Sequence, residues 1–163
     1  MITQLLGLAA LASLTLTAEQ DLRPNLPAFY THIDTVKEVV SDRCETIEIR
    51  DLPLLLDAAR TSQRQIDCSG FIYRGRPAFL ELMFSDDQLD LIIVMFEPGE
   101  YAAIETEYRE KFGPISHESG IGLYSYENAV ALRTQPHEIV FVSKRVRAQY
   151  QLYMEDMAVK AAQ

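Results

Sequence analysis

Residues 66–96 read IDCSGFIYRGRPAFLELMFSDDQLDLIIVMF, and this stretch decides the fold. Its first part, 66–73, is rich in residues that favour strands, and Arg-Gly-Arg at 74–76 is a turn signal. The next segment, 78–84, alternates between apolar residues and others. This period of two is typical of a strand with one buried face. The alternating apolar residues are Ala78, Leu80, Leu82 and Phe84.

The second half of the stretch predicts another hairpin. Ser-Asp-Asp-Gln at 85–88 is a polar turn, and LDLIIVMF at 89–96 is almost wholly apolar. A run of this length with β-branched residues predicts a strand in the centre of a sheet. Pro98 and Gly99 end it, so the stretch as a whole predicts three consecutive antiparallel strands.

Upstream of this stretch, the spacing of apolar residues predicts helices. Asn25 is suited to cap a helix, and the positions that follow recur every three or four residues. Segment 45–50 fits either a short strand or the frayed end of that helix. Asp51 and Pro53 predict a second helix start, with apolar residues through 54–59. The recurring apolar residues of the first helix are Phe29, Ile33, Val36, Val40 and Cys44.

Downstream, the same order of elements returns. Residues 100–112 have helical periodicity and end at Gly113-Pro114. A hairpin is expected from 121–126 and 129–134, and a third strand at 137–142. Ser143 is suited to cap a last helix.

The predicted fold class is therefore α+β. We expect one antiparallel sheet built from two βββα units, in the order ααβββαβββα, with the helices packed on one face. No linker divides residues 19–163, which we expect to form one compact domain.

The N-terminus predicts export. Residues 1–18 carry no charged side chain and are rich in leucine, which is typical of a signal peptide cleaved near Ala18. The apolar run is shorter than the ~20 residues that span a bilayer, so we expect no integral membrane span in the mature chain. A formal charge of −9 argues against nucleic-acid partners. The expected location is periplasmic or extracellular.

Two cysteines, Cys44 and Cys68, are present, without the spacing of a zinc site. In an exported chain they most simply pair with each other. We therefore predict one disulfide between them.

Asp67-Cys68-Ser69-Gly70-Phe71 resembles the segment around the nucleophile of papain-like cell-wall peptidases. This resemblance implies Cys68 as the nucleophile and His117 as the base of an enzyme that cuts peptidoglycan peptides. The nucleophile of that fold lies at a helix N-terminus, which lowers the pKa of the thiol. Gly75 and Pro77 leave little room for a helix after Cys68. We therefore expect a strand at 66–73, with Cys68 as a half-cystine and the short resemblance as coincidental.

The wider stretch from 65 to 96, together with Lys-Phe-Gly-Pro at 111–114, resembles small exported bacterial α+β domains. Their layout is similar to that of β-lactamase-inhibitor-like folds, in which strand layers pack on helices. This resemblance implies architecture and location, but no activity.

No metal or cofactor is predicted. Asp86, Asp87 and Asp90 fit a hairpin turn better than a calcium loop, because they lack the glycine and the bidentate glutamate of an EF-hand. The basic cluster at the start of the last helix has two interpretations: an anion or partner-binding site, or ion pairs with nearby carboxylates. Its residues are Ser143, Lys144, Arg145 and Arg147.

Together these features predict a non-catalytic exported domain that binds a protein or peptide partner in the cell envelope. The alternative is a papain-like cysteine peptidase that uses Cys68 and His117. The state of Cys68 separates the two, since a nucleophile must be a free thiol.

Overall fold

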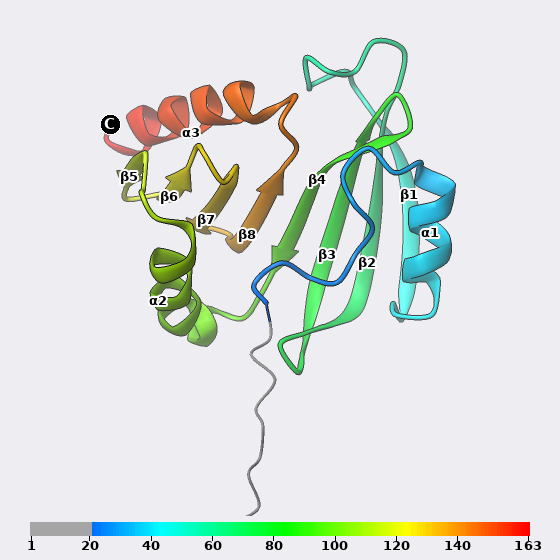
Figure 1. The fold of residues 1–163 in the computed structure, drawn as a ribbon, viewed down its shortest axis with the longest axis horizontal. Helices are drawn as coiled ribbons and strands as arrows, with labels where there is room; N and C mark the ends of the chain where they lie inside the picture. Colours follow the sequence, from blue (N-terminus) through cyan, green and yellow to red (C-terminus); the bar gives the residue numbers. More distant parts are fainter. Residues whose placement is uncertain (1–20) are drawn as a thin grey trace, which may run out of the picture.

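The structure, a computed structural model, describes residues 21–163, so the predicted signal peptide at 1–18 lies outside the described residues. The described chain forms three α-helices, one short 3-10 helix and eight strands (Figure 1). All eight strands belong to one antiparallel sheet with the order β1-β2-β3-β4-β8-β7-β6-β5. The predicted α+β class is therefore confirmed.

The elements have the following bounds. The strands are β1 Thr46–Leu52, β2 Gln63–Tyr73, β3 Arg76–Ser85, β4 Gln88–Met95, β5 His117–Ser119, β6 Gly122–Ser125, β7 Val130–Thr134 and β8 His137–Val142. The helices are α1 Ile33–Ser41, the 3-10 helix η1 Pro98–Glu100, α2 Tyr101–Phe112 and α3 Arg147–Ala161.

Two four-stranded meanders, β1–β4 and β5–β8, meet where β4 pairs with β8. The predicted order ααβββαβββα is wrong in two respects. Each unit has a fourth strand, β1 in the first and β5 in the second, and the helix expected at 53–59 is an irregular loop. The strand alternative for 45–50 is the one observed, as part of β1.

Side chains hold the loop from 53 to 62 in place of helical hydrogen bonds. The backbone N–H groups of Leu55 and Leu56 donate to Gln63 Oε1 at 2.7 and 2.9 Å. Those of Thr61 and Ser62 donate to Asp86 Oδ1 at 2.8 and 3.0 Å. Because the side chains of Gln63 and Asp86 satisfy these donors, the apolar run at 54–56 does not need to become helical.

The helices lie on both faces of the sheet, which corrects the expectation that they share one. The core on one face joins α1 and α2 to Ile92 and Val94 of β4. The core on the other face joins α3 to Leu91 and Ile93 of the same strand. Alternate residues of a strand point to opposite faces, so the continuous apolar run of β4 needs cover on both sides.

Two helices begin later than the sequence predicts. Helix α1 is capped by His32, whose Nδ1 accepts from Asp34 N at 3.3 Å, rather than by Asn25. Tyr30, with φ of 70°, ends the preceding turn in a left-handed conformation that no helix continues through. The α3 N-cap is Val146, without a side-chain capping bond. Ser143 has a different partner, described below.

None of the helices within residues 21–163 is long and apolar enough to cross a membrane.

Candidate functional site

One row of side chains crosses the whole sheet on the face that carries α3. Each member lies directly opposite the next on the neighbouring strand, so the row follows from the strand register alone. We call it the cross-sheet row. From β1 to β5 it consists of Glu48, Asp67, Glu81, Ile93, Val140, Ala131, Tyr124 and His117.

Helix α3 covers one half of this row. Tyr124, Ala131 and Val140 are completely buried, and they form one apolar cluster with Tyr150 and Met154 of α3. Figure 1 shows α3 lying across the β5–β8 half of the sheet. In this half the row is hydrophobic core, apart from His117 on the edge strand β5.

The other half of the row carries three carboxylates and has no helix over it. Within residues 21–163, the cluster beneath α3 includes no residue of β1 or β2, and α1 and α2 pack on the opposite face. Glu48 is exposed and Glu81 is half-buried, whereas Asp67 is buried by its neighbours. We call this surface the open face, defined by Glu48, Arg50, Asp67, Phe79 and Glu81.

Asp67 is fully partnered within the open face. The Arg50 guanidinium Nε lies 2.5 Å from Asp67 Oδ2, and Gln65 Nε2 donates to Asp67 Oδ1 at 2.6 Å. The hydrogen bond to Asp67 raises the pKa of Arg50. The arginine side of this ion pair is exposed to solvent, which screens the attraction, while Asp67 is buried.

Glu81 has no ion-pair partner among the described residues, since the Arg50 guanidinium contacts Asp67 instead. Burial raises the pKa of Glu81, and the neighbouring Asp67 charge raises it further. The Arg50 charge and a hydrogen bond from Gln65 lower this pKa, but the net shift is upward. The ionised form of Glu81 is therefore disfavoured in the isolated domain, and a cation supplied from outside would relieve that cost.

A similar carboxylate lies farther along the same face. Burial raises the pKa of Glu138, while the Arg133 guanidinium, whose Nη1 lies 2.7 Å from Glu138 Oε1, lowers it. The charge of Glu81 also acts on Glu138. The two carboxylates thus belong to one electrostatic surface, in which Glu138 has an internal cation and Glu81 does not.

An apolar hollow adjoins the open face. Phe79 lies two residues before Glu81 on β3 and therefore shares its face, about 7 Å away along the strand. Its cross-strand partner is Met95. A pocket of about 340 Å³ at this place is lined by Gly70, Pro77, Ala78, Phe79, Met95, Phe96 and Glu97. The open face therefore combines a carboxylate that has no ion-pair partner with a concave, largely apolar surface.

A second, shallower hollow of about 720 Å³ lies between α3 and the chain that follows α2. Ser116 in its lining already accepts the N–H of Tyr126 at 2.6 Å. Its two carboxylates, Glu127 and Glu155, have no basic residue in the lining to set up chemistry or recognition.

The basic cluster predicted at the start of the last helix surrounds an internal carboxylate. Ser143 Oγ donates to Asp90 Oδ1 at 2.6 Å. Arg145 donates to both oxygens of Asp90, from Nε to Oδ1 at 2.7 Å and from Nη2 to Oδ2 at 2.8 Å. Asp90 is completely buried. Of the two interpretations, ion pairing is thus observed for Arg145, and Ser143 adds a hydrogen bond to the same carboxylate. Lys144 is exposed, and Arg147 lies over the Tyr126 ring. Partner binding by this cluster stays a prediction.

The predicted disulfide is present between Cys44 and Cys68, with 5.4 Å between their Cα atoms. Cys68 is completely buried within β2, and residues 66–73 form a strand as predicted. His117 lies on β5 at the far edge of the sheet, six strand spacings from β2 and hence about 29 Å away. The structure does not bring Cys68 and His117 together.

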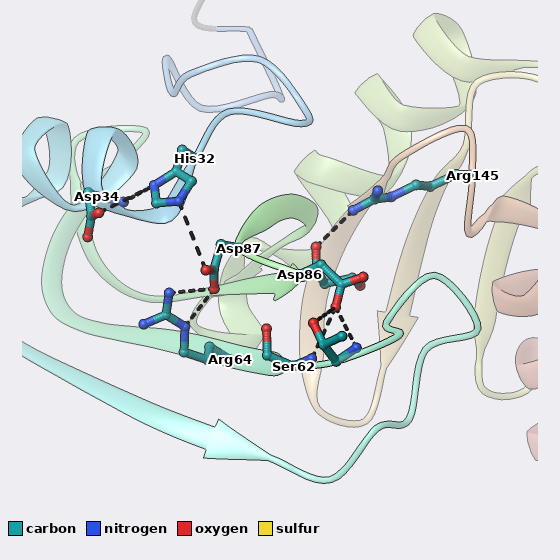
Figure 2. A network of polar contacts seen from close by, with 9 residues as sticks. His32, Asp34, Ser62, Arg64, Asp86, Asp87 and Arg145 are labelled. Carbon is teal, nitrogen blue, oxygen red and sulfur yellow. Dashed lines mark hydrogen bonds and ion pairs between the residues drawn. The ribbon is translucent and has the colours of Figure 1, made fainter.

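The acidic turn between β3 and β4 serves as a structural tie (Figure 2). Hydrogen bonds from the backbone N–H groups of Thr61 and Ser62 hold the pKa of Asp86 well below its usual range. Asp87 accepts from Arg64 Nε at 2.9 Å. Within residues 21–163 no group of three or more potential ligands could hold a metal ion. The turn thus fastens the loop at 53–62 to the sheet.

No protein-family model matches this sequence, and no curated protein or solved structure matches the chain.

Sequence reasoning missed the open face, although one signal was present. Glu81 interrupts the apolar run AFLELMF of β3, where a strand covered on both sides would carry an apolar residue. Its alignment with Asp67 and Glu48 depends on the strand register, which periodicity alone does not provide.

Proposed function

We propose that this chain is an exported, non-catalytic binding domain whose open face takes a segment of a partner protein in the cell envelope. The observation that carries the proposal is the cross-sheet row, which is apolar under α3 and acidic where no helix covers it. A sheet face without cover is a surface on which a partner can pack.

The chemistry of the face specifies the partner segment. Glu81 is a half-buried carboxylate without an ion-pair partner, and Phe79 lines a largely apolar hollow about 7 Å from it. A lysine or arginine next to a large apolar side chain would satisfy both features at once. The formal charge of −9 on the chain favours approach of such a basic segment.

Two observations support export. Residues 1–18 have the composition of a signal peptide, and Cys44 and Cys68 are bonded to each other. Disulfides persist in oxidising compartments such as the periplasm and the extracellular space. The bond also argues for a binding domain over the peptidase alternative, because a half-cystine is not a nucleophile.

Site-specific photocrosslinking in the cells that make the protein tests the proposal. Phe79 is replaced by the photoreactive benzoylphenylalanine, and Val159, an exposed residue on α3, is replaced in the same way as a control. We expect a discrete crosslinked partner from position 79, abolished by Glu81→Lys in the same chain. Equal crosslinking at 79 and 159, or a product insensitive to Glu81→Lys, would refute the proposal.

A further inference from the structure

The two edges of the sheet differ in how well they are protected. Edge strand β5 has three residues, and Arg109 of α2 reaches Glu118 on it with 2.6 Å between Nη2 and Oε1. Edge strand β1 has seven residues, of which five are exposed and two are half-buried. It pairs with β2 alone within the described sheet. A long edge strand offers its free N–H and C=O groups to another strand.

The sequence of β1, TIEIRDL, is complementary to itself. When two copies run antiparallel with Ile49 opposite Ile49, Glu48 of each copy lies opposite Arg50 of the other. Both residues of each pair lie on the same face, so opposite charges meet twice around a two-fold axis. We infer that β1 pairs with β1 of a second copy in this register, giving a two-fold symmetric dimer with a continuous sixteen-stranded sheet.

The register is specific. Centring the two-fold on Asp51 brings two aspartates together, and centring it on Ile47 removes both charge pairs. Pro53 follows the strand directly and has no N–H to extend the ladder. Charged residues on an edge strand usually prevent pairing with another strand. In β1 the opposite charges attract in the register centred on Ile49, and they disfavour the registers centred on Ile47 and Asp51.

The other face of the strand supports the same register. Ile49 is 40% exposed although it lies on the face that carries α1. In the dimer it packs against its own copy on the two-fold axis, which removes an exposed apolar side chain from water. The dimer joins two open faces into one, with Glu81 two strands away from the junction.

Sedimentation equilibrium of the mature domain over a range of concentrations tests the inference. We expect a monomer–dimer equilibrium that Glu48→Arg weakens roughly tenfold or more, because arginines then face each other twice. The double variant Glu48→Arg/Arg50→Glu restores the opposite charges, and Arg at 48 can still pair with Asp67. It should therefore dimerise like the wild type. Glu110→Lys, on the exposed side of α2, is the matched control and should change nothing.

Crosslinking gives a second measurement. Ile49→Cys should form a covalent dimer under mild oxidation, because residue 49 meets its own copy. Asp51→Cys should not, because its two copies lie four residues, or about 13 Å, apart along the strands. A monomer at every concentration, or a dimer that ignores Glu48→Arg, would overturn the inference. Neither result would change the expected crosslinking at Phe79, so the dimer and the proposed binding function are tested independently.

Discussion

Two halves of the same sheet face differ in composition because only one of them is covered. Under α3 the cross-sheet row consists of Tyr124, Ala131 and Val140, all completely buried. In the half without a helix it continues as Glu81, Asp67 and Glu48. On the opposite face, covered by α1 and α2, a comparable row stays apolar on β2, β3, β4, β8 and β7. It consists of Ile66, Leu82, Ile92, Phe141 and Val130. In the cross-sheet row the change from apolar to acidic residues thus coincides with the end of the cover that α3 provides.

Exchanging residues between the halves should break this pattern most strongly. Val140→Asp places an unpaired charge beneath α3 and should cost about 4 kcal/mol in the free energy of unfolding. The matched variant Glu81→Val, in the same row, should be as stable as the wild type or more so. Urea unfolding monitored by circular dichroism measures both. Equal losses in the two variants would mean that α3 does not distinguish the halves.

The disulfide stabilises the half that lacks α3. Cys44→Ala and Cys68→Ala should each lower the free energy of unfolding by roughly 3 kcal/mol, because the bond closes a loop of 24 residues in the unfolded chain. Reducing the wild-type protein should have a similar effect. Hydrogen exchange should then rise in β1 and β2 more than in β7 and β8. A uniform rise across all strands would show that the bond acts on the sheet as a whole.

The α3 connection should tolerate change at Lys144 but not at Arg145. Arg145→Ala leaves the buried Asp90 carboxylate with Ser143 as its remaining side-chain partner, and we expect a loss of about 2 kcal/mol, less than for a fully buried pair because Arg145 is partly exposed. Lys144→Ala removes an exposed charge and should change stability by less than about 0.5 kcal/mol. Thermal unfolding of both variants tests whether Arg145 stabilises the fold. Equally small losses of stability for the two variants would contradict this role.

The smallest effect concerns pH. Burial raises the pKa of Glu81 above its value in the unfolded chain. Its effect on the free energy of unfolding is therefore favourable at low pH, where the carboxyl is protonated, and this stability is lost as pH rises through the folded pKa. Glu81→Gln should therefore be more stable than the wild type at neutral pH by a few tenths of a kcal/mol. The difference should vanish near pH 4. Glu110→Gln, on the exposed side of α2, provides the control curve; an advantage for Glu81→Gln that persists at low pH would contradict this cause.

Much of the fold was readable from the sequence, and the failures have physical causes. The alternation at 78–84 and the apolar run at 89–96 predicted β3 and β4, and the two cysteines predicted their bond. The helix expected at 53–59 does not form, because the side chains of Gln63 and Asp86 accept hydrogen bonds from the backbone of this region and hold it as a loop. These side chains lie outside the segment, so its own pattern does not reveal them.

The candidate site was less predictable for a different reason. The cluster of Ser143, Lys144, Arg145 and Arg147 was interpreted either as an anion or partner-binding site or as ion-pairing residues. Asp90, which contacts Ser143 and Arg145, is 53 and 55 residues away from them in the sequence. The open face requires the register of β1, β2 and β3 together with the position of α3, and these depend on pairing between distant segments. Among the residues of the open face, Glu81 alone gave a signal in the sequence, because it lies within the apolar run of β3.

Carboxylate footprinting tests the central claim most directly. Carbodiimide-activated labelling is applied to the purified domain and to the protein in the cells that make it, and modification is quantified at Glu81 and at the α2 control Glu110. Glu81 lies two strands from the β1 edge, so pairing of two copies leaves it uncovered. We predict that Glu81 is labelled in the purified domain and protected in the cells, with Glu110 labelled equally in both. Equal labelling of Glu81 in the two settings would contradict the assignment of the open face as a binding surface.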